Sequence, residues 1–179
     1  MLVRVLVCGY MGTARLVELA FSRRNVKQAG PGHEGPGSRR RFRLMVALHT
    51  CVIAGTLLFG RRRHAGWLSL LASVQPLRYW ALLSLGRNWN ARGVVASKMT
   101  PVTKGPYAFV RHPNYAVVFV ELLALPAAFG IDRRAVIAAS AFNVALLTIR
   151  IREEEALLSQ VAGYDEAFAG KARFIPGLY

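Results

Sequence analysis

The sequence is poor in cysteine and in acidic residues, and each shortage narrows the classes of protein that it can encode. Its two cysteines, Cys8 and Cys51, both lie inside apolar runs, which excludes a disulfide scaffold. No pair of Cys or His has metal-ligand spacing, so no metal site is expected. Only 9 Asp and Glu accompany 24 Lys and Arg, which gives the 179 residues a formal charge of +15. So basic a chain usually suggests a nucleic-acid partner.

The distribution of the charges argues against that partner. Charged residues make up 18% of the chain and hydrophobic residues 54%, and the mean hydropathy is +0.31. The charges gather in short clusters between long apolar runs, as is typical of helical membrane proteins. The hydrophobic content also excludes a disordered chain. We therefore expect an all-α integral membrane bundle and no nucleic-acid partner.

Apolar runs of membrane-spanning length predict about five transmembrane helices. The runs are residues 1–21, 43–60, 65–86, 113–131 and 134–150. Residues 22–42, between the first two, are rich in Gly, Pro and Arg and are expected to form a mobile loop. After the fifth run, the stretch RIREEEALLSQVAGYDEAF continues the pattern as a charged helix, which predicts a cytosolic C-terminal helical extension.

The basic residues predict the orientation in the membrane. Sixteen of the 24 Lys and Arg lie in the first and third connections and in the C-terminal tail, whereas five lie in the other two connections, at 61–63 and 133–134. The positive-inside rule then predicts a cytoplasmic C-terminus and an outward N-terminus. The cluster RRRH at 61–64 works against this orientation. The dominance of Ala, Arg and Gly suggests a bacterial source, and hence a bacterial cell membrane.

The densest group of chemically active residue types is GPYAFVRHPNY, residues 105–115. Gly105 and Pro106 predict a turn, and Pro113 suits the first turn of the following helix. Taken alone, Arg111 and His112 are equally well explained as a basic anchor at the membrane interface.

A second group lies just beyond the fifth run. Arg150 and Glu154 are four residues apart, so on a helix they share a face and can pair. An exposed pair of this kind adds only tenths of a kcal/mol. Three adjacent carboxylates at 153–155, however, would face anionic lipid, and a bound cation makes better sense of them.

The order of GPYAFVRHPNY, an apolar run, RIREEEALL and the tail GYDEAFAGKARFIPGL resembles the isoprenylcysteine carboxyl methyltransferase family. These are integral membrane enzymes that use S-adenosylmethionine, and the resemblance covers roughly residues 84–179. The N-terminal half, with ELAFSRRN at 18–25 and LGRNWNARG at 85–93, is more similar to bacterial members. Some of those work beside type III polyketide synthases and methylate alkylpyrones or alkylresorcinols, which implies a lipid-like acceptor and an association with a polyketide synthase.

The resemblance also implies which residues form the site. The family's Arg-His-Pro-x-Tyr falls on Arg111, His112, Pro113 and Tyr115, and its Arg-Ile-x-x-Glu-Glu falls on Arg150, Ile151, Glu154 and Glu155. The implied cofactor-binding residues are Tyr107, Val110, His112, Pro113, Tyr115, Glu154 and Glu155. Val117 stands where the family usually has Gly, and Ala167 where it has a second Tyr, so the pocket edge is expected to differ.

On this basis residues 1–179 form one membrane-embedded domain, with three spans in 1–86 and a cofactor-binding methyltransferase core in 87–179. Arg111, Glu121 and Arg150 are the expected catalytic residues, and Arg78 and Arg150 the expected acceptor-binding residues.

Two alternatives stay open for the ionisable groups inside the spans. Glu121 is either a base or a partner of Arg78 or Arg15 that holds the bundle together, because charged groups inside a membrane are functional or paired. Arg78 either binds an anionic acceptor or extends to the interface. His49 is interpreted as an interhelical hydrogen-bonding group.

The leading hypothesis is therefore an S-adenosylmethionine-dependent O-methyltransferase that acts on an amphipathic lipid. An acceptor carboxylate or an acidic pyrone hydroxyl is ionised at neutral pH and needs no base, whereas a phenol with a pKa of about 10 benefits from one. The alternatives are a prenylated cysteine carboxylate or a phospholipid amine as acceptor and, outside the enzymes, a small membrane scaffold.

Overall fold

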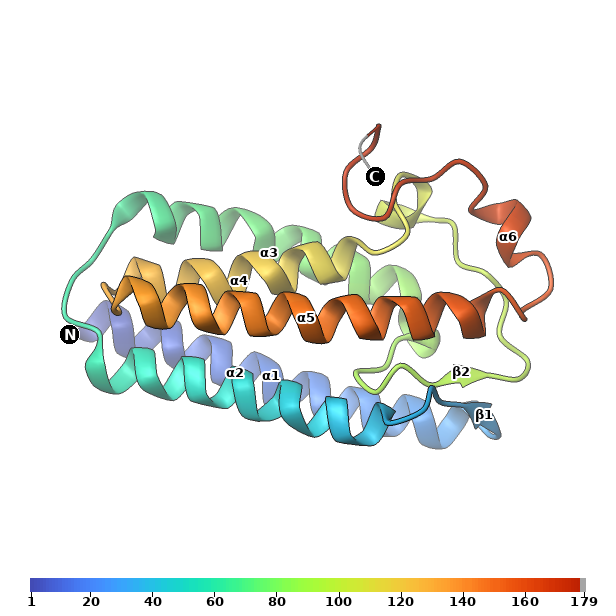
Figure 1. The fold of residues 1–179 in the computed structure, drawn as a ribbon, viewed down its shortest axis with the longest axis horizontal. Helices are drawn as coiled ribbons and strands as arrows, with labels where there is room; N and C mark the ends of the chain where they lie inside the picture. Colours follow the sequence, from blue (N-terminus) through green and yellow to red (C-terminus); the bar gives the residue numbers. More distant parts are fainter. Residues whose placement is uncertain (178–179) are drawn as a thin grey trace.

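The computed structural model describes residues 1–177, and in them five long helices pack side by side (Figure 1). The long helices are α1 (Leu2–Ala29), α2 (Ser38–Phe59), α3 (Ala65–Leu85), α4 (Pro113–Ala128) and α5 (Arg133–Leu158). The short elements are the paired strands β1 (Gly32–His33) and β2 (Val95–Ala96), the 3-10 turns η1 (Gly86–Asn88) and η2 (Gly105–Ala108), and the helical turn α6 (Tyr164–Ala167). The expected all-α bundle is confirmed.

Within residues 1–177, three helices are long and apolar enough to cross a membrane, namely α1, α2 and α5. The apolar helix α4 has 16 residues, fewer than the roughly 20 that a full crossing needs. It packs against α2, α3 and α5, and most of its residues are buried. α3 contains Pro76 and Arg78 and is not among the three candidates. By length and composition, α1, α2 and α5 are therefore the candidate membrane-spanning helices.

The predicted boundaries of the mobile loop, 22–42, are wrong at both ends, because α1 continues to Ala29 and α2 begins at Ser38. Tertiary contacts extend α1. Asn25 Nδ2 donates to the carbonyl oxygens of Gly86 and Trp89, at 2.9 and 2.6 Å. The residues that remain between the helices are held by the antiparallel pairing of β1 with β2.

The charged helix expected after the fifth span is present but interrupted. α5 continues as one helix to Leu158, eight residues beyond the predicted end of the span, and α6 resumes at Tyr164. Gly163 precedes α6 with φ at 77°, in the left-handed region that glycine adopts most readily. The predicted uninterrupted helix is therefore wrong between residues 159 and 163.

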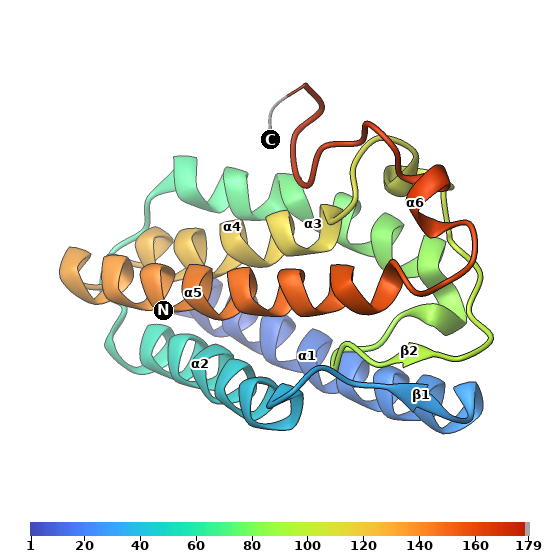
Figure 2. The ribbon, with the colours of Figure 1, turned by 45° about the vertical axis from the view of Figure 1, so that its right-hand side comes forward.

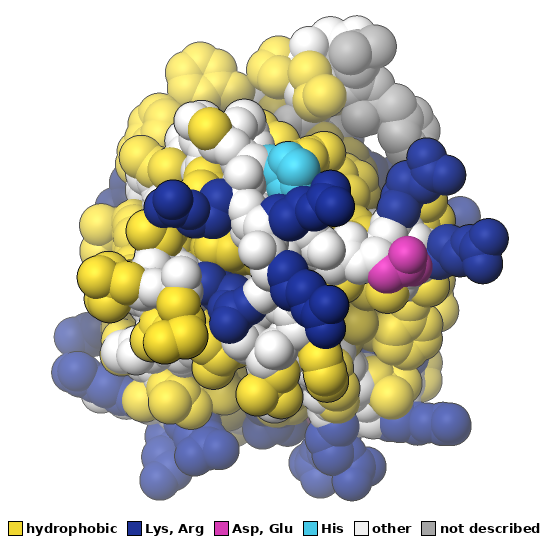
Figure 3. All heavy atoms as spheres, turned by 90° about the vertical axis from the view of Figure 1, so that its left-hand side faces the viewer, with side chains coloured by type: hydrophobic (Ala, Val, Ile, Leu, Met, Phe, Trp, Pro, Cys, Tyr) yellow, Lys and Arg dark blue, Asp and Glu magenta, His cyan; other side chains and the backbone are white. Residues whose placement is uncertain are grey.

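The five long helices alternate in direction, so the connections divide between two ends of the bundle (Figures 1 and 2). The α1–α2 connection, the α3–α4 connection and the C-terminal tail share one end, and the N-terminus and the other two connections share the opposite end. Figure 3 faces that opposite end, where basic side chains lie among apolar ones. The division matches the grouping of basic residues used above. Which end faces the cytoplasm stays a prediction.

A buried cluster of charged side chains joins α1, α3 and α4. Arg78 donates from Nε and Nη2 to the two carboxylate oxygens of Glu18, at 2.6 and 2.5 Å, and from Nη1 to Glu121 at 3.1 Å. Arg15 donates to Glu18 at 2.7 Å and also pairs with Glu121. Gln75 Nε2 donates to the other oxygen of Glu121 at 3.0 Å. Two arginines and two glutamates balance in charge, so the cluster is neutral as a whole.

Replacing one carboxylate of this cluster by an amide should destabilise the bundle. Glu121→Gln leaves a buried arginine charge uncompensated, which costs about 3–5 kcal/mol in buried ion pairs. We expect the midpoint of thermal unfolding in detergent to fall by about 6–20 °C. Glu166→Gln, at an exposed position on α6, is the matched control. An unchanged midpoint in Glu121→Gln would show that the cluster does not hold the helices together.

Candidate active site

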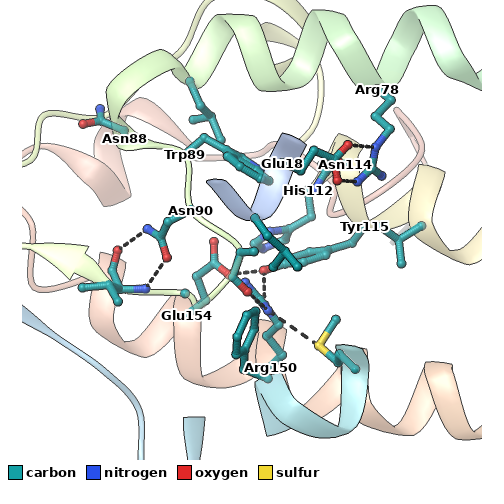
Figure 4. Close-up of a pocket in the computed structure, with 18 of the residues that line it drawn as sticks. Glu18, Arg78, Asn88, Trp89, Asn90, His112, Asn114, Tyr115, Arg150 and Glu154 are labelled. Atoms are coloured by element: carbon teal, nitrogen blue, oxygen red, sulfur yellow. Dashed lines mark hydrogen bonds and ion pairs between the residues drawn. The ribbon is translucent and has the colours of Figure 1, made fainter. Parts of the chain in front are cut away.

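A cavity of about 510 Å³ extends into the bundle between the helices (Figure 4). Its apolar wall comes from α1 and α2, through Gly12, Leu16, Leu19, Ile53, Ala54 and Leu57. Its polar wall comes from the start of α4, the last turns of α5, the loop after η1 and the helical turn α6. Residues from the three N-terminal helices and from the later part of the chain therefore line the same cavity. The assignment of the cofactor-binding core to residues 87–179 stays a prediction.

Arg150, Tyr115 and Glu154 form a hydrogen-bonded chain where α4 meets α5 (Figure 4). Arg150 Nε donates to the Tyr115 hydroxyl at 2.7 Å, and that hydroxyl donates to Glu154. Arg150 Nη1 also donates to the carbonyl oxygen of Ala91 at 2.6 Å. The expected pair of Arg150 and Glu154 is present, with 3.8 Å between Nε and Oε2. The Tyr115 hydroxyl bridges the two charged groups.

The C-terminal tail lies along the loop that contains Arg111 and His112. The backbone N–H of Arg111 donates to the carbonyl of Ala172 at 2.9 Å, and that of His112 donates to the carbonyl of Arg173 at 2.8 Å. Arg111 Nε donates to the carbonyl of Lys171 at 2.8 Å, and Lys171 Nζ donates to the carbonyl of Tyr107 at 3.0 Å. The tail therefore holds this side of the cavity in place.

Glu155 on α5 joins the loop before α4 to the C-terminal tail through His112 and Arg173. Its Oε1 lies 3.1 Å from His112 Nε2, and its Oε2 accepts from Arg173 at 2.8 Å. Glu155 lies beyond the apolar part of the helix. Burial alone would raise the pKa of this carboxyl, but the hydrogen bonds from His112 and Arg173 outweigh it and lower the pKa to about 2. Glu155 is thus an ionised structural partner of the tail and of His112.

The structure places most of the expected site residues around the cavity. Those that line it are Arg78, Tyr107, Arg111, His112, Tyr115, Arg150 and Glu154. Those that do not are Val110, Pro113, Glu121 and Glu155. Val110 and Pro113 are buried at the end of the η2 loop and at the first position of α4. Glu121 is 1% exposed and pairs with Arg15 and Arg78, the structural alternative considered for it.

Several lining residues were not found from the sequence. Asn114 lines the cavity, and its Oδ1 is buried without a hydrogen-bond partner among residues 1–177. Asn114 lies inside GPYAFVRHPNY, so that motif could have indicated it as a site residue. Glu18 lines the cavity from α1, far from either motif, and no spacing pattern pointed to it.

Aromatic side chains from α6 complete the polar end. The rings of Tyr164 and Phe168 lie 4.7 Å apart, and both line the cavity with Tyr107. Burial, with the nearby Glu154 carboxylate, raises the pKa of Tyr164 to about 12 and raises that of Tyr107 as well. Both hydroxyls therefore stay protonated at neutral pH and can donate hydrogen bonds.

These residues fit S-adenosylmethionine, which carries an aromatic base, an ammonium, a carboxylate and a sulfonium. Glu154 offers a carboxylate to a cationic group, and Asn114 Oδ1 is an unused acceptor at the cavity wall. The rings of Tyr107, Tyr164 and Phe168 offer apolar faces to a base. The donor set thus matches both the charged and the aromatic parts of this cofactor.

Comparison with known proteins decides the family. The model of the Isoprenylcysteine carboxyl methyltransferase (ICMT) family matches residues 67–160, more than half of the chain. The chain belongs to this family. It is also 36% identical over 156 residues to the uncharacterized protein YpbQ of Bacillus subtilis (strain 168), a match that covers 82% of this chain and 90% of that relative.

The expected family is therefore confirmed, and with it an integral membrane methyltransferase. The matched range 67–160 contains most of α3, all of α4 and all of α5. It includes the Arg111–Tyr115 segment and the carboxylates at 153–155, so both motifs that line or support the cavity belong to the ICMT match.

Proposed function

We propose that this ICMT family member transfers the methyl group of S-adenosylmethionine to an oxygen atom of an amphipathic lipid. The observation that carries the proposal is the single cavity, in which the polar group of Arg150, Tyr115 and Glu154 continues into an apolar wall from α1 and α2. A substrate with a polar head and an apolar tail matches both parts. Because the wall belongs to membrane helices, the tail enters from the bilayer.

The residues of the chain then divide the work as follows. When bound, S-adenosylmethionine supplies an electrophilic methyl group on a positively charged sulfur. Glu154 would hold its ammonium group, Tyr107 and Phe168 would pack on its adenine, and Arg111 would attract its carboxylate, since all four side chains line the cavity. Transfer between a sulfonium and an oxygen anion neutralises charge, so the exclusion of water and the alignment of the two partners provide much of the rate.

The acceptor head is assigned to the part of the cavity near Arg150. Arg150 holds the Tyr115 hydroxyl beside Glu154, and both side chains line the cavity. Arg78 also lines it, but its Nε, Nη1 and Nη2 atoms donate to Glu18 and Glu121. We therefore assign Arg78 to the acceptor wall as part of the neutral cluster, and Glu121 to holding Arg78 in position.

Oxygen acceptors fit this wall better than an amine does. Arg111 lines the cavity and has no carboxylate partner within residues 1–177, so it would repel a cationic ethanolamine head. An alkylpyrone or an alkylresorcinol combines a ring hydroxyl with an alkyl tail and is the acceptor class proposed here, with a polyketide synthase as the partner that would supply it. A prenylated cysteine carboxylate, after which the family is named, has the same head-and-tail form and is the second candidate.

Binding of the cofactor tests the first part of the proposal. We expect detergent-purified wild-type protein to bind S-adenosylmethionine in calorimetry and Glu154→Gln to bind it about 10–100-fold more weakly, because a charged hydrogen bond contributes about 1.5–3 kcal/mol. Glu153→Gln is the matched control, since Glu153 pairs with Arg41 and does not line the cavity. A well-folded wild type that does not bind S-adenosylmethionine would contradict the proposal.

We further propose that the protein lies in a bacterial cell membrane with its C-terminus in the cytoplasm. The polar end of the cavity is formed by the tail, α6 and the last turns of α5, so this orientation opens it where S-adenosylmethionine is made. A green fluorescent protein fused to the C-terminus should then fluoresce, and alkaline phosphatase inserted at 61–64 should be active. The reverse pattern would contradict the orientation.

A further inference from the structure

His49 on α2 carries a proton acceptor that faces the cavity. Its Nδ1 lies 2.7 Å from the carbonyl oxygen of Met45 on the same helix. Because a carbonyl oxygen only accepts hydrogen bonds, Nδ1 is the donor, and the neutral ring then has its lone pair on Nε2. Within residues 1–177, Nε2 has no hydrogen-bond partner, and the side chain lines the cavity. The interhelical bond expected for His49 is therefore absent from the described residues.

The position of His49 along α2 is between the polar site and the apolar wall. Met45, one turn earlier, has its sulfur 3.6 Å from Arg150 Nη1. Ile53 and Leu57, one and two turns later, belong to the apolar wall. One turn of helix advances about 6 Å over four residues. The imidazole thus borders the place where the head of a lipid would join its tail.

The two carboxylates beside the apolar wall are already engaged. Glu18 and Glu121, from α1 and α4, pair with Arg15 and Arg78. All four of their carboxylate oxygens accept hydrogen bonds from Arg15, Arg78 or Gln75, so neither group is open to a hydroxyl of the acceptor.

At the polar end the situation is similar. Glu154 accepts from Tyr115 and lies 3.8 Å from Arg150. His112 Nε2 donates to the Glu155 carboxylate, which leaves the lone pair of that ring on Nδ1. Two imidazoles therefore line the cavity with a lone pair that has no partner in residues 1–177, and His49 is the one beside the apolar wall, whereas His112 is held at the C-terminal tail. An ionisable side chain inside a membrane span is costly to bury, and such residues are usually functional.

We infer that His49 is the general base of the methyl transfer, and that the acceptor group is a hydroxyl that is protonated at neutral pH, such as a phenol. The inference rests on the proposed function and narrows its substrate class. Nε2 of His49 takes the hydroxyl proton as the acceptor oxygen forms its bond to the methyl carbon. The sulfonium–methyl bond breaks with its electron pair on sulfur, and the imidazolium later returns the proton to water. A carboxylate acceptor would need no such base.

A coloured acceptor analogue tests this assignment without turnover. The probe is a nitrophenol with a pentadecyl chain, whose phenolate absorbs at longer wavelength than its phenol, bound to full-length protein in nanodiscs. We expect the bound phenolate fraction at neutral pH to be about 10-fold lower in His49→Gln than in wild type, since one hydrogen bond to a charged group contributes about 1.5 kcal/mol. Cys51→Ala, which alters an exposed residue of α2 that does not line the cavity, should behave as wild type.

Turnover gives a second readout. With pentadecylresorcinol as acceptor, general-base catalysis predicts a loss in kcat of about 10²–10⁴-fold in His49→Gln, with the Kd for S-adenosylmethionine unchanged. Binding of S-adenosylmethionine also shows that each variant is folded. If His49→Gln does not bind it, His49→Met, whose side chain is of similar length, takes its place in both measurements.

The outcomes separate the inference from the proposed function. Equal phenolate fractions in wild type and His49→Gln, or an equal loss in Cys51→Ala, would overturn the role of His49 while binding of S-adenosylmethionine upheld the methyltransferase. A probe that shows no spectral change with wild type would also overturn it, because the acceptor head would not reach the imidazole. Failure of wild type to bind S-adenosylmethionine would overturn both proposals.

Discussion

The neutral cluster of Arg15, Glu18, Arg78 and Glu121 is the interaction on which the arrangement of the bundle depends. It joins α1, α3 and α4 inside the apolar interior, where an unmatched charge would be very costly. Three of its four members also line the cavity, so the same contacts that join the helices form part of the polar surface of the cavity. The stability of the bundle and the shape of the cavity therefore depend on the same side chains.

The polar end of the cavity depends on segments that are far apart in the sequence. The loop before α4 is held by the C-terminal tail, and Glu155 on α5 joins that loop to the tail through His112 and Arg173. Arg150 is fixed by Tyr115 on one side and by the carbonyl of Ala91 on the other. The polar end is therefore held by backbone and charge-assisted hydrogen bonds, whereas the wall from α1 and α2 is mainly apolar.

The apolar runs predicted the long helices well, since hydrophobic length is a direct consequence of a membrane environment. The two motifs predicted the polar end of the cavity, because Arg111, Tyr115, Arg150 and Glu154 all line it. What the sequence did not predict depends on tertiary contacts. α1 is extended by the hydrogen bonds of Asn25, and Glu18, which lines the cavity, is held there by Arg78 and Arg15. Local patterns carry no information about such partners.

We propose that cofactor and acceptor share one cavity between α1, α2, α4 and α5. A crystal structure with S-adenosylhomocysteine bound would test it most directly. The predicted result places the amino group of the ligand at Glu154 and its adenine against Tyr107, Tyr164 and Phe168, with the apolar wall of α1 and α2 left open for a lipid. A ligand bound outside this cavity, or one that fills the wall between Leu16 and Leu57, would contradict the account.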